Sequence, residues 1–399
     1  MHKLEITLKQ HTPLIHFQHD QEGATLRASE VKPKLDKFIK TALKKLCPEI
    51  FDKYKPLIDK IPDEHNKVNS PYKLSIRLKD EKAIDKYVIG SYIPKNKSEN
   101  YQKQGYRILN KAPYFADNKM IKDGLTGEDD YKLGIMLKKN NTLDLIFRFW
   151  DPEWKEFLQS IIPLFFAVTN FGTREDKGFG CFYPVDKDRT DLESTLRLFS
   201  GKALYCSIGS FGITETFKEI DAIYKKMKSG DQRTDSELRK HFNSMRPMIE
   251  WEKPEIQEQI GKISKQSISS KTNKRQFVRA LLGLPEIYEY PKCDSKVLVS
   301  YKCEGETDKE KKIEGKEGKE GKEKKIARYA SPVSFKVFDG YIYLYVSQQE
   351  SMITNQTFEF EIQGTETKFS LTTPEAFNVI DFLNIAMKHQ KKWIKIDKQ

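Results

Sequence analysis

The sequence predicts an α+β protein built from two tandem ferredoxin-like (RRM-like) βαββαβ domains with loop insertions. Two observations carry this prediction. In the first half of the chain, apolar residues alternate at strand spacing and recur at helical spacing in the order strand, helix, strand, strand, helix, strand, and the same order returns in the second half. The length of 399 residues is sufficient for two ordinary domains. The predicted domains are residues 1–190 and 191–399.

Turn and cap residues define the elements of the first domain. The predicted elements are a strand ending at Thr12-Pro13, a helix over 31–46, strands at 72–78, 133–137 and 143–150, a helix over 152–168 and a closing strand at 179–183. The strands at 133–137 and 143–150 are predicted to form a hairpin through Asn140-Asn141, because Asn tolerates the left-handed backbone region. Asp151-Pro152-Glu153 has the pattern of a helix N-terminus, with the aspartate as N-cap. Most of the remaining sequence between 47 and 130 is interpreted as loop insertions.

The second domain repeats the order with larger insertions. Its predicted elements are a strand at 203–208, a helical insertion at 214–283, a hairpin of strands 331–338 and 341–347, a second hairpin within 358–371, a helix opened by Thr373-Pro374-Glu375 and an edge strand at 393–396. Asp339-Gly340 is a strong hairpin signal. Residues 304–326 are low-complexity Lys, Glu and Gly, lack apolar residues to bury and are predicted to be a disordered loop.

Composition favours a polyanionic partner. The formal net charge is +12 with a pI near 9.1, and the basic excess is concentrated in residues 218–280. The five cysteines are scattered without a CxxC pair, so neither a metal site nor a disulfide framework is indicated, and no cofactor is expected. A reducing cytoplasm fits this cysteine usage best. The sequence shows no signal peptide and no apolar run long enough to span a bilayer, so a cytoplasmic protein without membrane attachment is expected.

The stretch Thr169-Asn170-Phe171-Gly172-Thr173-Arg174-Glu175-Asp176-Lys177-Gly178-Phe179-Gly180 is the most informative motif. It follows an apolar helix and precedes a short strand. Arg174 and Lys177 supply positive charge for phosphate, and glycine lets another backbone approach closely. We interpret Gly172, Gly178 and Gly180 as structural enablers more than as direct ligands. Gly-rich turns with surface charges are common, so the motif gains weight only from its context.

Further candidates for RNA contact are basic residues near predicted helices. Arg27, Lys32 and Lys34 lie at the start of the first helix, where a helix N-terminus attracts phosphate; the alternative is a capping segment with Ser29 as N-cap. The other candidates are Lys274, Arg275 and Arg279 on a predicted helix, and Arg328. Each could instead be a solvated or ion-paired surface charge. Tyr341, Tyr343 and Tyr345 alternate along one strand, and we favour a sheet-building role for them over base stacking.

Three separated stretches together resemble the RAMP superfamily of CRISPR effector proteins, and are most similar to the first-subunit family of the Cmr (type III-B) complex. The stretches are Thr12-Pro13-Leu14 with Gly23-Ala24-Thr25-Leu26-Arg27-Ala28-Ser29-Glu30-Val31-Lys32, the glycine motif above, and Ala280-Leu281-Leu282-Gly283-Leu284-Pro285 with Arg328-Tyr329-Ala330-Ser331-Pro332-Val333. This chain departs from the usual pattern at Pro33, Asp36, Asn170-Phe171 and Glu175-Asp176. The departures leave the fold prediction intact and weaken the prediction of RNA contact by the loop.

The resemblance implies a non-catalytic RNA-binding subunit of an RNA-guided, RNA-targeting antiviral complex. Its implied partners are the guide (CRISPR) RNA, whose 3′ region it would hold, the target RNA paired with it, and other Cmr subunits. A homo-oligomer is not expected as the working state. A loop that contacts phosphates without reading bases suits a sequence-tolerant guide holder.

Two alternatives stay open at the level of sequence. Some RAMP proteins cleave CRISPR transcripts without a metal by using an N-terminal histidine as general acid or base, and His16 and His19 are the candidates here. Those enzymes are usually shorter and place the glycine motif near the C-terminus, which argues against catalysis in this chain. The second alternative is a general RNA-binding protein outside CRISPR biology.

Overall fold

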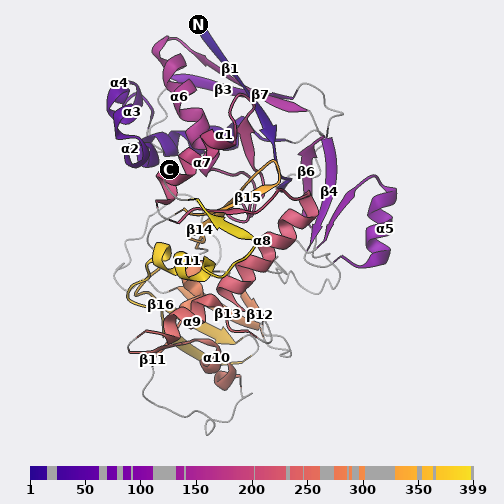
Figure 1. The fold of residues 1–399 in the computed structure, drawn as a ribbon, viewed down its shortest axis with the longest axis vertical. Coiled ribbons are helices and arrows are strands. Elements are labelled where there is room, and N and C mark those ends of the chain that lie inside the picture. The colour runs from indigo at the N-terminus through magenta and orange to yellow at the C-terminus, as the bar shows by residue number, and fades with distance from the viewer. Residues whose placement is uncertain are drawn as a thin grey trace, which may run out of the picture. The chain divides into compact units, whose positions relative to one another are not determined.

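The computed structural model describes residues 1–15, 25–62, 70–78, 84–90, 93–110, 132–138, 141–201, 203–230, 234–245, 247–260, 274–284, 287–289, 296–301, 329–347, 353–362 and 365–396. The chain forms two compact units (Figure 1). The first contains residues 1–223, 333–347 and 390–399, and the second contains 224–332 and 348–389. Because neither unit is a continuous segment, the division into domains 1–190 and 191–399 stays a prediction about the order of elements along the chain.

The first unit begins with an antiparallel sheet, which we call the N-terminal sheet. Its strand order is β3-β7-β1-β8. The strands are β1 (His2–Gln10), β3 (Tyr72–Leu78), β7 (Thr142–Phe149) and β8 (Phe182–Pro184). The register pairs Leu4 with Phe147 and Leu8 with Leu143, so that apolar side chains gather on one face. That pairing aligns the buried faces of β1 and β7.

Helices cover this apolar face. The first helical segment is continuous from α1 (Ala28–Lys37) through a π-helical stretch (Phe38–Ala42) to α2 (Leu43–Leu46), and the second is α6 (Glu153–Val168). α6 buries a row of large apolar side chains, and the core they share with the sheet contains Val31, Leu35, Trp154, Phe157, Ile161, Phe165 and Phe166. α6 begins one residue later than expected: Pro152 is the N-cap, and Asp151 Oδ1 accepts a hydrogen bond from the Glu153 backbone N–H at 3.1 Å.

The region between β1 and β7 holds more regular structure than the sequence predicted. It contains α3 (Pro48–Lys53), α4 (Lys55–Ile58) and α5 (Lys95–Lys103), together with a mixed sheet of order β2-β6-β4-β5. The strands of this sheet are β2 (Leu14–Ile15), β4 (Ile84–Gly90), β5 (Arg107–Asn110) and β6 (Lys132–Leu137). The predicted hairpin of β6 with β7 is wrong, because β6 pairs with β2 and β4 whereas β7 pairs with β1 and β3.

A third sheet in the first unit repeats the topology of the N-terminal sheet, and we call it the C-terminal sheet. Its order is β14-β15-β9-β18, antiparallel throughout. The strands are β9 (Tyr205–Ser207), β14 (Val333–Phe338), β15 (Tyr341–Val346) and β18 (Trp393–Lys395). The predicted Asp339-Gly340 hairpin joins β14 to β15, with Asp339 at φ +46° and Gly340 at φ +82°. Tyr343 and Tyr345 are buried in the core, as a sheet-building role requires.

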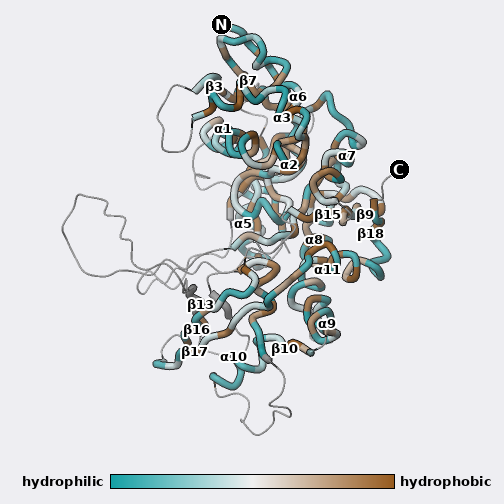
Figure 2. The backbone as a smooth tube through the Cα atoms, turned by 90° about the vertical axis from the view of Figure 1, so that its left-hand side faces the viewer, coloured by the Kyte–Doolittle hydropathy of each residue, from teal (hydrophilic) through white to brown (hydrophobic). Residues whose placement is uncertain are grey.

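Two helices accompany this sheet along the chain. α7 (Arg189–Ser200) carries a capping box, in which Asp188 accepts from the Asp191 N–H and the Asp191 carboxylate accepts from the Asp188 N–H. α8 (Ile213–Lys228) follows β9 and crosses the sequence boundary between the units at residue 223. Figure 2 shows hydrophobic stretches alternating with hydrophilic ones along these segments.

The second unit contains a parallel pair of strands and a larger antiparallel sheet of order β12-β13-β16-β17. Its strands are β10 (Ile249–Trp251), β11 (Lys274–Gln276), β12 (Ile287–Glu289), β13 (Lys296–Tyr301), β16 (Thr357–Ile362) and β17 (Lys368–Thr372). Its helices are α9 (Glu237–Asn243), α10 (Lys253–Gln259), the 3₁₀ helix η3 (Val278–Leu282) and α11 (Val379–Met387). The core of the larger sheet includes Phe277, Phe358 and Phe360.

Two predicted helices of the second half differ from the structure. Residues 274–283 form β11 and η3 instead of one helix, because the buried Glu252 carboxylate accepts the backbone N–H groups of Val278 and Arg279 and starts a new segment there. The last helix begins at Val379 instead of near Thr373. Its N-cap is Asn378, whose Oδ1 accepts from the N–H groups of Ile380 and Asp381.

Several predictions fall on residues that the structure does not describe: His16, His19, Arg328 and the 304–326 loop. Among the described residues, the free cysteines are Cys47, Cys181 and Cys206, and no cluster of His, Cys, Asp and Glu could hold a metal ion. Within those same ranges, no helix combines the length and the apolar character needed to cross a bilayer.

Candidate nucleic-acid interface

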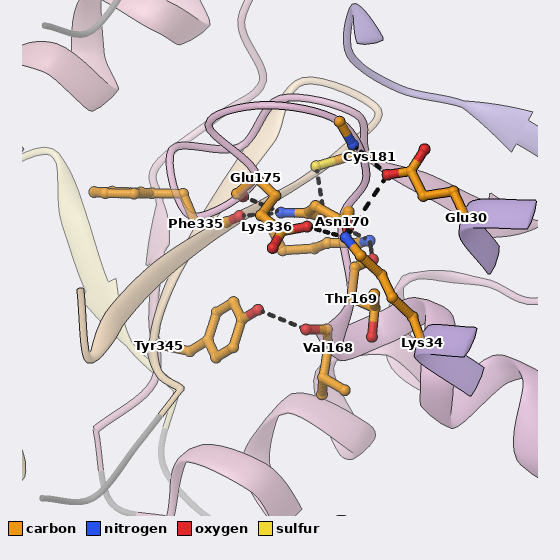
Figure 3. A network of polar contacts seen from close by, with 11 residues as sticks. Glu30, Lys34, Val168, Thr169, Asn170, Glu175, Cys181, Phe335, Lys336 and Tyr345 are labelled. Carbon is orange, nitrogen blue, oxygen red and sulfur yellow. Dashed lines mark hydrogen bonds and ion pairs between the residues drawn. The ribbon is translucent and has the colours of Figure 1, made fainter. Parts of the chain in front are cut away.

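The structure brings the start of α1 and the glycine loop (residues 170–180) together, although they are far apart in the sequence. Glu30 Oε1 accepts a hydrogen bond from the Gly172 backbone N–H at 2.7 Å. Lys34 Nζ donates to the Asn170 carbonyl at 3.1 Å and forms an ion pair with Glu175 (Figure 3). Two of the three stretches that carried the sequence resemblance therefore form one continuous feature.

The glycines of this loop are required by space as well as by backbone conformation. Gly172 has φ +79°, and a Cβ there would lie 2.4 Å from the Ile15 carbonyl oxygen. Gly180 has φ +63°, and its Cβ would lie 1.9 Å from the Phe171 oxygen. Side chains are excluded at both positions. Gly178 packs against Ile220. This supports the interpretation of these glycines as structural enablers.

Most of the loop's described N–H groups bond within the protein. Phe171 N donates to Gly180 O, Gly172 N to Glu30, and Thr173 N to Ile15 O. Gly178 N donates to Glu175 O, and Gly180 N to Pro13 O. A bound phosphate would therefore meet side chains more than a cradle of free backbone amides. These contacts favour charge attraction by side chains over recognition by backbone amides.

Arg174 occupies the tip of the loop in an uncommon backbone conformation. Its φ is +61°, the left-handed region, which a non-glycine residue rarely adopts. Its carbonyl accepts a hydrogen bond from the Lys177 backbone N–H at 2.9 Å, which closes a turn. Arg174 is half-buried and Glu175 is exposed. The turn holds the arginine at the edge of the loop.

Two cations beside the loop tip have acidic partners. Lys177 is buried, and its ammonium lies 2.7 Å from Asp176. Lys32 bonds to Asp36 at 2.6 Å and lies 4.5 Å from the centre of the Tyr72 ring. Lys34 pairs with Glu175 and lies 3.7 Å from Glu30, and its side chain is 32% exposed.

Among the described residues, no side-chain capping bond is found at the N-cap of α1. The N-cap position is Arg27, which is half-buried, and the expected alternative of Ser29 as N-cap is wrong because the helix begins at Ala28. α7 has a full capping box at the same place in its own sequence. An uncapped helix start next to basic residues suits an anion.

Buried residues that the sequence did not single out anchor the loop. Lys336 of β14 is fully buried, and its ammonium donates to Thr169 O at 3.1 Å, Asn170 Oδ1 at 2.9 Å and Phe182 O at 3.2 Å (Figure 3). Burial lowers the pKa of Lys336 to about 8. A lysine in the strand Val333–Phe338, whose other residues are apolar apart from Ser334, was the signal in the sequence that could have identified it.

Asn170 connects this lysine to the tip of the loop. Its Nδ2 donates to Glu175 O at 2.7 Å and to Phe335 O at 2.9 Å. Its Oδ1 also accepts from the Cys181 thiol at 3.2 Å. In addition, Phe335 N donates to Asp176 O at 3.0 Å, which attaches the loop to β14 as a short extra strand. All these groups lie in the first unit.

Two basic candidates of the second half, Arg275 and Arg279, belong to the second unit and are held by acids. Arg275 donates to Glu255 at 2.6 Å and to Glu258 at 2.9 Å, and lies 3.6 Å from Glu250. The hydrogen bonds that Arg275 donates to Glu258, and then those to Glu255, raise its pKa despite burial. Arg279 pairs with Glu252, whose side chain is fully buried. Lys274 lies in β11, next to Arg275.

The third pair of resembling stretches also meets within the second unit. Leu284 N donates to Tyr329 O at 3.1 Å, and a Cβ on Gly283 would lie 3.3 Å from the Ser331 N. The Leu-Gly-Leu segment therefore packs directly on the Tyr-Ala-Ser segment. Gly283 has φ +98°, which explains the glycine at this contact.

Comparison with known proteins gave matches to two family models and to solved structures, among them the two that follow. The family model for the Cmr1 N-terminal domain matches residues 1–231, and the model for the Cmr1 C-terminal domain matches residues 233–398. The crystal structure of apo Cmr1 from Pyrococcus furiosus is similar at 9% identity and a TM-score of 0.37, over 99% of this chain and 98% of that one. No curated protein matched the chain.

A chain of the type III-B Cmr-beta complex bound to cognate target RNA, solved by cryo-electron microscopy, is similar at 12% identity and a TM-score of 0.28. The match covers 46% of this chain and 58% of that one, so less than two thirds of the relative is spanned. At such TM-scores the family assignment rests on the two domain models.

Proposed function

This chain belongs to the Cmr1 family, and from that premise we propose that it is a non-catalytic RNA-binding subunit of a type III-B Cmr effector complex. In this role it holds the 3′ region of the guide RNA and its duplex with target RNA, beside other Cmr subunits, in antiviral defence. The proposed fold is a pair of tandem ferredoxin-like units. The shared strand order of the N-terminal and C-terminal sheets supports that fold.

One observation carries the proposal: the start of α1 and the glycine loop form a single feature that presents Lys34 and Arg174. Lys34 reaches the loop from α1 and keeps about a third of its side chain exposed. Arg174 lies at the tip of a rigid turn. Such a pair contacts phosphates without contacting base edges, which suits a guide of any sequence. The net charge of +12 supplies long-range attraction to RNA.

The proposal includes no chemistry of its own for this chain. The described loop residues provide cations and packing, with no histidine among them. The alternatives are a metal-free CRISPR RNA-processing endoribonuclease, for which His16 or His19 would have to act, and a general RNA-binding protein. Incubation of the purified chain with guide precursor tests the first: specific cleavage that is lost in His16→Ala or His19→Ala would replace the present proposal.

An electrophoretic mobility-shift titration with guide RNA tests the binding role. Arg174→Glu should weaken RNA binding about tenfold or more, because a charge-assisted contact of roughly 1.5–3 kcal/mol is lost and repulsion is added. Lys155→Glu is the matched control, since Lys155 is an exposed cation on α6 away from the loop. The double change Arg174→Glu with Lys177→Glu is a poorer test, because Lys177 is buried and its reversal would disturb packing.

Equal RNA affinity for the wild type, Arg174→Glu and Lys155→Glu would remove the loop from the interface. Equal losses for the two variants would show that only net charge matters, and would leave a non-specific basic protein. The assembled complex supplies the second test: a Cmr complex lacking this chain should lose protection of the guide's 3′ region against nuclease.

A further inference from the structure

The end of α6 is completed by side chains from other parts of the chain. A helix leaves its last carbonyl groups without partners inside the helix, and α6 has no basic residue in its last turn. Three consecutive carbonyls here each accept a hydrogen bond from a different element. Val168 O accepts from the Tyr345 hydroxyl at 3.1 Å, Thr169 O from Lys336, and Asn170 O from Lys34 (Figure 3).

Lys336 is the most deeply placed of these donors, and its effect extends to the loop tip. Its ammonium orients the Asn170 amide, because Asn170 Oδ1 accepts from it while Asn170 Nδ2 donates to Glu175 O. Phe335, the neighbour of Lys336, bonds through its own N–H and carbonyl to Asp176 and Asn170. Residues 175–177 are thereby attached to β14, directly after Arg174.

Arg174 needs such support. A non-glycine residue in the left-handed region is disfavoured, and it stays there only where the surrounding contacts fix the chain on both sides. On one side, Thr173 N donates to Ile15 O at 2.9 Å. On the other side, the attachment to β14 depends on Asn170 and Lys336. Loss of the attachment to β14 would let Arg174 return to negative φ and turn its guanidinium away from the phosphate-binding position.

We propose that Lys336 is a positioning residue for RNA binding: by fixing Asn170 and the 175–177 segment, it holds Arg174 in the conformation that contacts phosphate. The inference rests on the proposed function, since it assigns a supporting residue to the same loop. It makes RNA binding by the N-terminal half depend on a strand from the C-terminal half, 166 positions from Asn170 along the chain.

A double-mutant cycle in the full-length chain tests this dependence. Arg174→Ala, Lys336→Met and the combined variant are titrated with labelled single-stranded guide RNA. We expect each single variant to weaken binding about tenfold and the combined variant to be no weaker than either, because both remove the same contact. Leu4→Ala is the matched control: Leu4 is a buried residue of β1 in the same unit, and it pairs with Phe147 in the N-terminal sheet instead of with β14.

The outcomes separate the two proposals. Weakened binding by Arg174→Ala with wild-type binding by Lys336→Met would overturn the positioning role while keeping the loop as the interface. Additive losses in the combined variant would also overturn it, because they would mean that Lys336 acts elsewhere. Wild-type binding by Arg174→Ala would overturn both proposals. Hydrogen exchange provides an RNA-free readout: amides of residues 173–178 should exchange faster in Lys336→Met than in Leu4→Ala, and equal exchange would contradict the inference.

Discussion

Two groups of enclosed cations in this molecule are held in opposite ways. Lys336, in the first unit, is surrounded by neutral acceptors: two carbonyl oxygens and an amide oxygen. Arg275 and Arg279, in the second unit, face the carboxylates of Glu250, Glu252, Glu255 and Glu258. The directions of the pKa shifts follow this difference. Burial lowers the pKa of Lys336 to about 8, whereas the carboxylates raise the pKa of Arg275.

The comparison shows why counting basic residues overestimates the surface available to RNA. Sequence alone makes Arg275 and Arg279 attractive phosphate ligands, yet each is already paired with an acid that lies outside the motif in sequence. Lys336 was not predicted as a site residue, yet it sets the geometry of the loop. The partner of a cation decides its role. The cation can be neutralised inside the protein, it can orient neighbouring groups, or it can stay available to a ligand.

Removal of a cation should cost more stability in the second unit. Arg279→Met leaves the buried Glu252 carboxylate without its counter-charge, and we expect a loss of about 3–5 kcal/mol. Lys336→Met leaves three neutral acceptors, each with one hydrogen bond fewer. For this change we expect a loss of stability of about 1–2 kcal/mol. Urea unfolding followed by circular dichroism, with a separate transition fitted for each unit, measures both. A larger loss of stability for Lys336→Met than for Arg279→Met would contradict the contrast between the two units.

The loop that Lys336 anchors should not tolerate side chains at its glycines. Gly180→Ala would place a Cβ 1.9 Å from the Phe171 oxygen at positive φ, and we expect a loss of about 3 kcal/mol. Gly209→Ala is the control, because Gly209 also has positive φ but no atom lies within 4 Å of its added Cβ. That change should cost about 1 kcal/mol, from backbone strain alone. Thermal unfolding measures the difference, and similar losses would mean that the close approach is relieved.

Alkaline pH should change the stability contributed by Lys336 and leave that contributed by Arg279 unchanged. The folded-state pKa of Lys336 is about 8 and its ordinary value is 10.5, so between these values the unfolded chain binds more protons and stability rises with pH. From pH 8 to 9.5 the contribution is about 1.5 kcal/mol. Lys336→Met should lose this rise, and Arg279→Met should keep it. The measurement is the difference in unfolding free energy between each variant and the wild type across that range; a parallel profile for Lys336→Met would contradict it.

Salt dependence of RNA binding should show the smallest effect. Arg174→Ala should reduce the slope of log affinity against log salt by about 0.7, the value for one phosphate contact on single-stranded nucleic acid. Arg275→Met should leave the slope unchanged, because its charge is compensated by three glutamates. Mobility-shift titrations at several salt concentrations give both slopes. An equal reduction for Arg275→Met would place the second unit in the interface.

The sequence predicted best the elements whose signals lie within a short stretch of residues. β7 and α6 alternate or repeat their apolar residues clearly, and the Asp339-Gly340 turn was identified from two residues. The strands β4 and β5 were missed, since their polar or irregular composition carries no clear period. The π-helical stretch 38–42 lies within the helix predicted over 31–46, and the apolar pattern did not indicate its change of hydrogen-bond spacing. The pairing of β6 was predicted wrongly because adjacency along the chain favours a hairpin, while the actual partners β2 and β4 are distant in sequence.

By itself, the sequence determined the mixed α and β composition, the basic character, the family resemblance and the glycine loop as the central motif. Those features are encoded in residue types and short spacings. Only the tertiary structure decided which charges are compensated, that Glu30 and Lys34 complete the loop, and that Lys336 enters it from β14. The physical reason is that hydrogen bonds and ion pairs depend on distance in space, and these partners are separated by more than a hundred positions along the chain.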